Sequence, residues 1–575
     1  MLSAKINNQW IDMFPGTSIK YVFNSPAFSD SPIVGDFSYT VSFPLTDVNK
    51  GVFDYVNLAD NFEDTVEFDI ELYNEGIYLI FGVFQIKNVS GKISGNIINS
   101  AFSFSNQIKN KTTKDLDLGG TIDLSIITHD VFLLSVINGC FPDYNFTLFP
   151  VLNEILYDGT IVEAAWHDIL YINRYNPSTT DHIFYPYLAY VINQIFKTFN
   201  YNISNSLANN NELSKLVLLG VFKENLYDLY VYNHYNLVEH IIECDLIKLL
   251  KQINSTFCTS FFFDHKTQSA EMIFNKDLLS STDYVDWTDK VVGEVNKEFE
   301  EIEDGYNLNY DFDSADQSIS DRQIKDGIID EYTMELPVLT PDDLPIYENM
   351  GMHGNEVRYV TCEDTYYIIK NFPNPNPNYI WIVLTWNFFS KITGEGLKER
   401  RSKLSTLGMN WHLKETGTLK DDWMVPHSNQ ELFSDPIKGF KDYAVDVPDY
   451  DRCIPQYVNK FEPRILFYRG MCPDVSNNNY PLGSSGKYDA KGNSLGNLTL
   501  NWDGDDGLYE NFHKKWLTFR ENSKPQKFLI LLNEIDLLNL KINKKIKINS
   551  NFYLPKKITI DLPIKKSATV EMYRI

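Results

Sequence analysis

The first 110 residues alternate apolar and polar side chains, a pattern that predicts antiparallel β-structure. In the segment FSYTVSF, apolar residues recur at every second position, and a strand places them all on one face. These residues are Phe37, Tyr39, Val41 and Phe43. A strand with one apolar face needs a core on one side only. The pattern therefore predicts a β-sandwich or barrel.

Two more segments extend this prediction. The stretch VEFDIELYNEGIYLIFGVFQI (66–86) is expected to form two strands around a turn at Asn74, Glu75 and Gly76, where a glycine allows the tight reversal of a hairpin. The stretch IINSAFSFSNQI (97–108) is expected to add a further strand. Residues 1–150 are accordingly predicted to form an N-terminal β domain.

Helical spacing replaces alternation in the next region. In YPYLAYVINQIFKTFNYNI (185–203), Pro186 suits a first helical turn, and apolar residues follow at helical intervals. They are Tyr187, Val191, Ile195 and Phe199. The segment 244–274 predicts an amphipathic helix capped by Asp245, then two strands joined by a turn at 264–268. Residues 151–312 are predicted to form a domain of helices and β-hairpins.

The remainder of the chain divides into two further predicted regions. Residues 313–450 are acidic and rich in proline, and are interpreted as an insertion; residues 451–575 are predicted to form a C-terminal strand–helix–strand domain. Within the latter, the segment 476–497 is predicted to be a long polar surface loop. The chain closes with predicted strands at 544–554, 556–562 and 568–575. The fold class is thus mainly β with some α, an α+β chain of several domains with antiparallel sandwich or barrel units and helix–hairpin insertions.

Charge narrows the classes of function. The 575 residues carry 77 acidic against 51 basic side chains, a net charge of −26. Such a chain is a poor general binder of nucleic acid, because phosphate contacts need clustered Lys and Arg. A local basic segment, KINKKIKIN (541–549), is interpreted as a solvated edge strand with protective lysines.

Cysteine usage and hydropathy indicate a protein made in a reducing cytoplasm. The six cysteines are widely separated and form neither a C-x-x-C pair nor a zinc-type cluster with histidine. The N-terminal segment lacks the pattern of a signal peptide, and no apolar run reaches the roughly 20 residues of a spanning helix. No membrane-spanning segment is predicted.

The densest candidate for chemistry is NWDGDDGLYENFHKKW (501–516). A calcium loop beginning at Asp503 would need an acidic ligand at Gly507 and a glycine at Leu508, and both requirements fail. The segment instead suits a helix in which Asp505 and Asp506 cap the N-terminus. Its apolar stripe is Leu508, Phe512, Trp516 and Phe519. The aspartates are therefore interpreted as turn and cap residues.

Other candidates are weaker. His240 and Glu243 could share a helix face, but two ligands do not make a metal site. Trp381 and Trp386 could stack on a glycan, although so dense an apolar run is more typical of a buried strand. A carboxylate pair for glycoside hydrolysis is set by distance in space and cannot be selected from sequence. No catalytic, cofactor-binding or metal-binding residue is predicted, and no cofactor.

Three ordered blocks resemble the tail hub, or baseplate hub, proteins of bacteriophages that infect Bacteroides-like bacteria (crAss-like or related phages). The first comprises 33–58, 66–89 and 110–120; the second comprises 186–204, 246–279 and 283–291; the third comprises 464–471, 480–486, 498–519 and the closing strands. In the third block, W-x-G-x-x-G-L-Y-x-x-F-x-x-x-W resembles a strand–turn–helix of these hubs. The resemblance implies that Trp502 ends a strand and that Tyr509, Phe512 and Trp516 pack the helix.

The resemblance implies a structural virion protein without enzymatic activity. Such hubs form part of a ring that connects the tail channel to fibres or the distal tail, and they let DNA pass during ejection. Expected partners are other copies of the chain, with threefold or sixfold symmetry, and other tail proteins; passing DNA would not be bound specifically. Assembly is expected in the host cytoplasm. The alternatives are a receptor-binding or glycan-binding tail protein, a virion-associated hydrolase, and a cytoplasmic scaffold.

Overall fold

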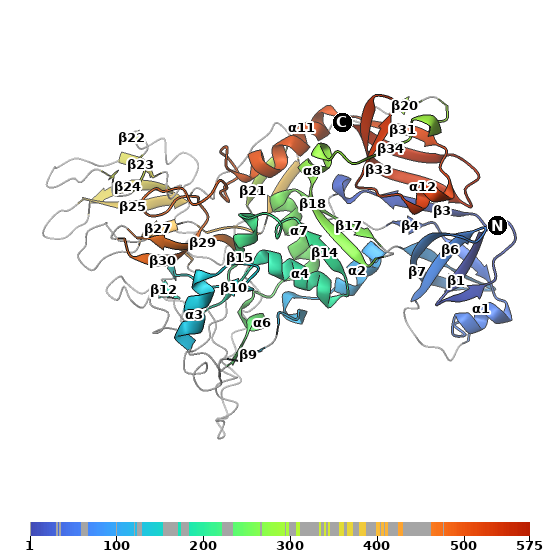
Figure 1. Cartoon of the computed structure of the whole chain (residues 1–575), viewed down its shortest axis with the longest axis horizontal. Coiled ribbons are helices and arrows are strands. Elements are labelled where there is room, and N and C mark those ends of the chain that lie inside the picture. The colour runs from blue at the N-terminus through green and yellow to red at the C-terminus, as the bar shows by residue number, and fades with distance from the viewer. Residues whose placement is uncertain are drawn as a thin grey trace, which may run out of the picture.

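The structure is a computed structural model of the whole chain. It describes residues 2–152, 171–220 and 234–310 with short gaps, separate pieces between 333 and 428, and residues 462–575 with one short gap. Strands from the two chain ends lie together at one end of the molecule, helices occupy the middle, and small sheets lie at the other end (Figure 1). The fold is mainly β with some α and has several units, which confirms the predicted fold class.

One sheet of fourteen strands, here called the terminal sheet, combines the two ends of the chain. Its main path runs β2-β1-β6-β7-β8-β4-β3-β33-β34-β31-β20, and β5, β19 and β32 pair beside that path. From the N-terminal part come β1 (Leu2–Ile6), β2 (Gln9–Ile11), β3 (Ile19–Asn24), β4 (Phe37–Ser38), β5 (Val41–Pro44), β6 (Glu67–Asn74), β7 (Ile77–Val89) and β8 (Lys92–Ile98). The later strands are β19 (Tyr284–Asp286), β20 (Asn296–Lys297), β31 (Pro525–Ile530), β32 (Lys545–Ile548), β33 (Asn551–Leu562) and β34 (Ala568–Arg574).

The pairing of β3 with β33 is the seam between the chain ends. It is antiparallel and runs from Ile19 opposite Leu562 to Asn24 opposite Lys557. The side chains of both segments enter one core cluster, in which Ile560 and Tyr21 are almost completely buried. The N-terminal strands therefore share both their hydrogen bonds and their core with the end of the chain.

The predicted hairpin between β6 and β7 is confirmed. Glu75 and Gly76 form its turn with φ of 49° and 84°, and Asn74 pairs with Ile77. Two consecutive residues with positive φ match the right-handed twist of the flanking strands. Gly76 adopts the second of these conformations without the steric cost of a Cβ.

Two predictions for the N-terminal strands are wrong in part. Phe37 and Tyr39 are exposed rather than buried beside Val41 and Phe43, because one extra residue lies between Phe37, opposite Ile98 of β8, and Val41, opposite Gly95. The alternation slips there, so the buried residue is Ser38, whose hydroxyl oxygen accepts a hydrogen bond from the Ile97 amide at 2.8 Å.

The segment 97–108, predicted as a strand, is largely a helix. β8 ends at Ile98, and α2 (Ser100–Ile108) follows. Phe104 of this helix is fully buried and stacks on Phe196 with ring centroids 4.7 Å apart. The apolar residues that looked like strand alternation instead lie on the buried face of this helix. Tertiary packing favoured the helix over the strand.

The prediction that the lysine-rich segment 541–549 forms an edge strand is wrong. β32 lies between β19, with which it pairs in parallel, and β33. One of its lysines meets an acid of the neighbouring strand: Lys547 Nζ lies 3.0 Å from an oxygen of Asp286, while Lys545 Nζ donates to the Leu279 carbonyl oxygen at 2.9 Å. The predicted strand 544–554 is in fact a hairpin that turns at Asn549, and β33 continues through Pro555 with a bulge.

The middle of the molecule follows the predicted helices and hairpin. Its helices are α3 (His129–Asn138), α4 (Leu188–Thr198), α6 (Leu237–His240), α7 (Leu246–Phe257) and α8 (Asn275–Ser280). The Asp245 carboxylate caps α7 by accepting a hydrogen bond from the Lys248 amide at 2.8 Å, as predicted. Pro186 lies one residue before the N-cap of α4, so it precedes the first turn that it was predicted to occupy.

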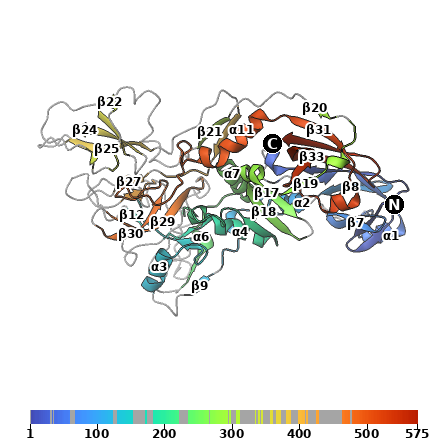
Figure 2. The ribbon, with the colours of Figure 1, turned by 45° about the horizontal axis from the view of Figure 1, so that its top comes forward.

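A three-stranded sheet lies against these helices. β17 (Thr259–Asp264) and β18 (Ser269–Phe274) form the predicted hairpin, and β14 (Asn202–Asn205) pairs with β18 in parallel. Together the helices and this sheet enclose a second core cluster, which extends to the helix α11 (Lys514–Asn522). Turning the molecule keeps the middle part between the terminal sheet and the smaller sheets (Figure 2).

An aromatic cluster joins the terminal sheet to the middle. Phe28 follows β3 and stacks on Tyr573 of β34, with centroids 4.7 Å apart, and its ring also lies 5.3 Å from Trp516 of α11. The Arg520 guanidinium lies 5.1 Å and 5.2 Å from the rings of Phe28 and Tyr573. Such contacts combine apolar burial with cation–π attraction. The cluster fixes the terminal sheet against α11.

Smaller sheets occupy the far end. β15 (Leu216–Leu218), β29 (Ile465–Pro473) and β30 (Asn479–Ser484) form one of them. Between residues 333 and 428 the structure describes a sheet of β22 (Thr333–Met334), β23 (Glu356–Val360), β24 (Thr365–Asn371) and β25 (Tyr379–Trp386). The four-range division into domains stays a prediction, although the terminal sheet takes strands from the first, second and fourth ranges.

We expect a fragment of residues 1–150 not to fold by itself. β3 would lose its pairing with β33, and the core cluster of the terminal sheet would lose every side chain that comes from beyond residue 284. Circular dichroism during heating should show no cooperative transition for the fragment alone. Supplying residues 524–575 in trans serves as the control and should restore structure in part. A sharp cooperative transition of the isolated fragment would contradict this account.

Candidate functional site

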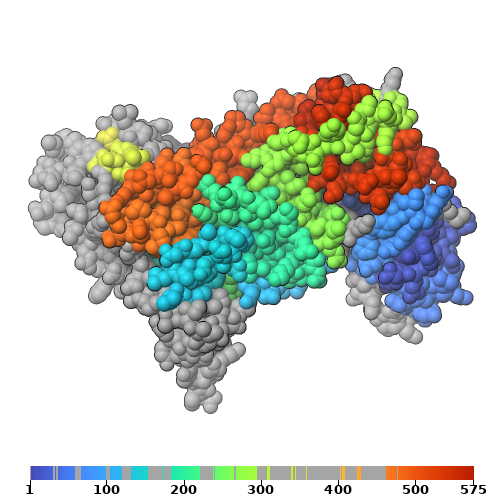
Figure 3. Space-filling model, in the orientation of Figure 1, coloured from blue at the N-terminus to red at the C-terminus, as the bar shows by residue number. Residues whose placement is uncertain are grey.

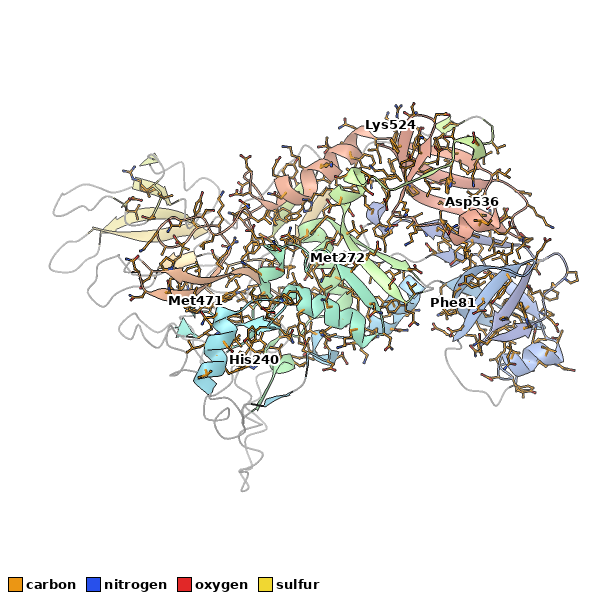
Figure 4. The ribbon with its side chains drawn as sticks, in the orientation of Figure 1. Phe81, His240, Met272, Met471, Lys524 and Asp536 are labelled. Atoms are coloured by element: carbon orange, nitrogen blue, oxygen red, sulfur yellow. The ribbon has the colours of Figure 1, made fainter. Side chains whose placement is uncertain are left out.

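The candidate site is the set of polar turns at the end of β29 and β30, which contains the predicted surface loop 476–497. β29 is a buried strand held between β15 and β30. Its register shifts at Gly470, whose φ of 81° suits glycine. The shift turns Met471 to the surface, and Figure 4 shows this residue at the far end from the terminal sheet.

The predicted loop is not one irregular excursion. Residues 479–484 are strand β30, and its partner strand is β29. The rest, from Ser485 to Asn497, folds back along the middle of the molecule in a series of hydrogen-bonded turns. The prediction of a long polar loop is therefore wrong for β30 and incomplete for the turns that follow. Gly483 and Ser484, the last two residues of β30, carry no apolar alternation, so the pattern did not indicate a strand there.

A buried arginine anchors these turns. The Arg469 side chain is 2% exposed, and its Nη1 donates to Glu212 Oε1 at 2.7 Å. Its Nη2 donates to the carbonyl oxygens of Gly486 and Leu498, at 2.6 Å and 2.7 Å, and Nε donates to Gly486 as well. The guanidinium also lies over the Phe467 ring, 4.1 Å from its centroid. One side chain thus ties together three segments that are distant in sequence.

Glu212 completes this anchor from the opposite side. Its carboxylate accepts hydrogen bonds from the amides of Asn497 and Leu498, each at 3.0 Å. A Cβ at Gly496 would lie only 2.1 Å from Glu212 Oε1, so glycine is required for this close approach. Burial lowers the pKa of the Arg469 guanidinium, and the Glu212 carboxylate opposes that shift. A buried charge is tolerated here because it is paired and its donors are satisfied.

Two turns of the site have the same construction. In each, a buried aspartate accepts hydrogen bonds from the amide and the side-chain nitrogen of an asparagine four residues later. Asp474 does so with Asn478, at 2.6 Å and 3.0 Å, and Asp489 with Asn493, at 2.8 Å and 2.9 Å. The third residue after each aspartate has positive φ, 71° at Asn477 and 77° at Gly492. The repeated D-x-x-x-N spacing was the sequence signal for these matched turns.

Side chains connect the two turns to each other and to the DGDDG segment. Lys491 Nζ donates to Asn477 Oδ1, which bridges the turns. Lys487 forms an ion pair with Asp506, and this contact raises the pKa of Lys487. The Thr499 amide donates to the Asp506 carbonyl oxygen at 2.9 Å. The turns therefore form one connected polar surface.

The prediction that the aspartates of segment 501–516 cap a helix is wrong. Asp503 to Gly507 make a turn closed by hydrogen bonds from the Leu508 amide to Asn501 and from the Tyr509 amide to Trp502, at 2.7 Å and 3.0 Å. The N-cap position is Leu508, and no side chain caps it. Asp506 instead pairs with Lys487. The interpretation of the aspartates as turn residues describes their positions, but their predicted role as caps is wrong.

A five-residue π-helix, Tyr509–His513, leads from this turn into α11. The predicted apolar stripe is confirmed for Leu508, Phe512 and Trp516, which are buried in the middle core; Phe519 packs against it. His513 Nε2 lies 2.9 Å from the Thr256 carbonyl oxygen. Trp502 is fully buried but lies in the turn rather than at the end of a strand.

The weaker candidates do not come together. α6 ends at His240, so Glu243 lies beyond the helix and not on a shared face. His240 is buried in the middle part, where its Nδ1 accepts a hydrogen bond from the Phe184 amide at 3.3 Å (Figure 4). Trp381 and Trp386 lie in strand β25, and the placement of their side chains is outside the described part.

The described residues contain no group of three or more His, Cys, Asp or Glu side chains placed to hold a metal ion. Among the described cysteines, Cys140, Cys244, Cys258 and Cys472 are not joined in disulfides. Burial raises the pKa of Cys244 and of Cys472 to about 12. Within the described ranges, no helix is both long and apolar enough to cross a membrane.

Comparison with known proteins leaves this chain without an assigned family. No family model matches it, and no curated protein matches it. Among solved structures, it is similar to the 43 kDa tail protein of prophage MuSo2 from Shewanella oneidensis, at 7% identity and a TM-score of 0.27. The alignment covers 100% of this chain and 98% of that one. A likeness this weak carries no argument about fold or function.

We expect Arg469→Met to lower the free energy of unfolding by about 3–5 kcal/mol, because it leaves the carboxylate of Glu212 and two carbonyl groups without their donor. Urea denaturation followed by fluorescence measures the change. Lys514→Met is the matched control: it removes an exposed pair with Glu510 and should leave stability unchanged within error. Equal effects of the two substitutions would show that the Arg469 anchor is not built as described.

Proposed function

We propose that this chain is a structural protein of a bacteriophage tail, and within the tail a hub. In this role it forms part of the ring that connects the tail channel to fibres or the distal tail. DNA passes through that ring during ejection without specific binding. The chain is made and assembled in the host cytoplasm and resides in the virion.

The observation that carries this proposal is that segments resembling hub proteins, from both ends of the sequence, lie in one sheet. The first and third blocks, which resemble hub proteins at opposite ends of the sequence, both contribute strands to the terminal sheet. β4 of the first block and β33 of the third pair with opposite sides of β3, which lies outside both blocks. Segments of one functional unit are expected to meet in this way, whereas unrelated short patterns have no reason to do so. The resemblance and the topology therefore support the same unit.

Charge is compatible with a channel. A chain with a net charge of −26 repels phosphate in general, which favours sliding of DNA over retention. The described helices and sheets pack through two extended cores, a construction that suits a rigid structural part. The proposal does not depend on an enzymatic site.

Labelling of particles tests the proposed location. An antibody raised against the chain should label the tail of particles purified from the culture that produces it, viewed by electron microscopy. Label on the tail, away from the capsid shell and fibre tips, is the expected result. Antibody pre-absorbed with the purified chain is the control. If the chain is absent from both intact and opened particles, the virion assignment is wrong.

We further propose that the polar turns of the candidate site contact a neighbouring tail protein. They are held in one conformation by Arg469 and Glu212, and a surface ordered in advance loses less entropy when it binds. Met471 adds an exposed apolar side chain beside them. The orange part of Figure 3, which includes β29 and β30, lies on the other side of the middle part from the terminal sheet.

Substitution on this surface tests the contact without removing strand β30. Met471→Glu combined with Asn479→Glu should lower the amount of chain that copurifies with particles, because charge is placed in the contact while the buried anchor stays intact. Quantitative mass spectrometry of particles measures the amount. Tyr39→Glu, at an exposed residue of the terminal sheet, is the control. Unchanged incorporation of the double variant would remove this surface from the proposal.

A further inference from the structure

Three lysine side chains, here called the lysine cluster, come together where α8, α11 and β32 meet. Lys276 lies in α8, Lys515 in α11 and Lys545 at the start of β32. α8 packs against α11 (Figure 1), and β32 comes from the basic segment 541–549. The fold therefore gathers positive charges that lie far apart along the sequence.

Two members of the cluster are held at the end of α8. Lys545 Nζ donates to the Leu279 carbonyl oxygen at 2.9 Å, and Lys515 Nζ donates to the hydroxyl oxygen of Ser280 at 2.5 Å. One lysine is enough to satisfy a terminal carbonyl group and to match the negative end of a helix dipole. A second ammonium group at the next residue adds repulsion, so capping of α8 does not account for the pair.

Lys276 approaches the same place from within α8. Its Nζ donates to the Asn511 carbonyl oxygen at 2.5 Å and lies 4.9 Å from the centroid of the Phe512 ring. The Ser280 hydroxyl that accepts from Lys515 donates in turn to the Lys276 carbonyl oxygen, at 3.2 Å. Each ammonium group of the cluster is therefore fixed by an uncharged acceptor.

The members of the cluster repel one another. Burial lowers the pKa of Lys276 and of Lys545, and the positive charge of Lys515 lowers both further. Lys515 is therefore near both of the others and is the central member. It is exposed, and the other two are half-buried, so an ion from solution can reach the cluster.

Carboxylates neutralise adjacent lysines but not the cluster itself. Lys514 pairs with Glu510 at 2.8 Å, and Lys544 pairs with Asp283 at 3.7 Å. Within the described part of the chain, the three cluster ammonium groups donate to carbonyl and hydroxyl oxygens and form no ion pair. Asp277 is exposed and opposes the lowered pKa of the lysine that precedes it. The main counter-charge is thus left to come from outside the chain, although the chain has 77 acidic residues.

The donors of the cluster match a phosphate group. An ammonium group is a compact charge with three donors, and each Nζ uses one of them in the hydrogen bonds given above. A phosphate group has at least about three acceptor oxygens and up to about two negative charges, so it can accept from all three lysines at once. A carboxylate has one charge and pairs best with the planar fork of an arginine.

From these observations we infer that the lysine cluster binds a small phosphate anion, inorganic phosphate or pyrophosphate. Lys515 holds the anion at the centre, and Lys276 and Lys545 donate to it from the two flanking elements. The bound anion offsets the repulsion among the three lysines and links α8, α11 and β32. The inference is independent of the proposed tail role, because it concerns a property of the purified chain.

Titration of the full chain with pyrophosphate at low salt tests the site. Calorimetry should show saturable binding that weakens as salt is raised, because salt screens exposed charges. Pyrophosphate should also raise the midpoint of thermal unfolding, since a ligand of the folded chain stabilises it. A wild-type chain that binds neither pyrophosphate nor inorganic phosphate would overturn the inference.

Substitution of the central lysine assigns the binding. Lys515→Gln should raise the dissociation constant for pyrophosphate at least about tenfold, because it removes the central charge. Lys514→Gln is the matched control: it removes the same charge from the neighbouring position of α11, where the lysine pairs with Glu510. Equal weakening by the two substitutions would show that general attraction holds the anion, and would contradict the site.

Stability without ligand separates binding from a structural role. Lys515→Gln should unfold at a temperature no lower than the wild-type chain, because it relieves repulsion within the cluster. A marked loss of stability with unchanged pyrophosphate binding would make Lys515 purely structural and overturn the inference. If Lys515→Gln does not fold, Lys545→Gln takes its place in both measurements, with the same expected results.

A phosphate-bearing polymer is the alternative ligand. A short single-stranded DNA oligonucleotide, titrated in parallel, should bind no more tightly than pyrophosphate, because the chain as a whole is acidic and repels a long polyanion. Binding of the oligonucleotide without binding of pyrophosphate would assign the lysines to a nucleic-acid contact and remove the small-anion site.

Discussion

The pairing of β3 with β33 is the interaction on which the rest of the structure depends. It joins segments more than 530 residues apart, from Ile19 opposite Leu562 to Asn24 opposite Lys557. Without it the N-terminal strands would lack hydrogen-bond partners on one side and part of their core. Phe28, which follows β3, would not be placed against Tyr573 and Trp516. Bringing such distant segments together has a large entropic cost, which only a long ladder and an extensive shared core can offset.

That seam also determines where charge lies. The acidic first 98 residues and the basic last 52 become two halves of one sheet rather than two separate domains. Opposite charges also meet among the later strands and α12 (Glu534–Leu538), as between Lys547 and Asp286 and between Lys290 and Asp536.

Beyond the middle part, in the turns that follow β29 and β30, order is maintained by a different kind of interaction. Apolar burial supports β29, but the turns beyond it are polar and are held by Arg469, Glu212 and the matched aspartates Asp474 and Asp489. A buried arginine is costly unless its donors are satisfied, and here four hydrogen bonds, one of them to the Glu212 carboxylate, satisfy them. The two parts are therefore held by different interactions: strand pairing and a shared apolar core in the terminal sheet, and buried polar contacts in these turns.

Local signals in the sequence were reliable where local physics decides the outcome. The β6–β7 turn follows from Glu75-Gly76, and the start of α7 follows from the capping carboxylate of Asp245. Helical spacing found α4, and alternation found β6 and β7, because these periods reflect which face is buried. The same reasoning failed at 37–43 and 97–108, where a break in a strand and a buried helical face imitate alternation.

The sequence by itself determined the β-rich class, the hairpins, the capped helices and the imbalance of charge, since each of these depends on residues within a few positions of one another. Only the tertiary structure decided that β32 lies inside a sheet, that Arg469 meets Glu212, and that the two chain ends form one unit. Contacts of this kind join residues hundreds of positions apart. They are selected by the free energy of the whole packed chain, which no short stretch of sequence contains.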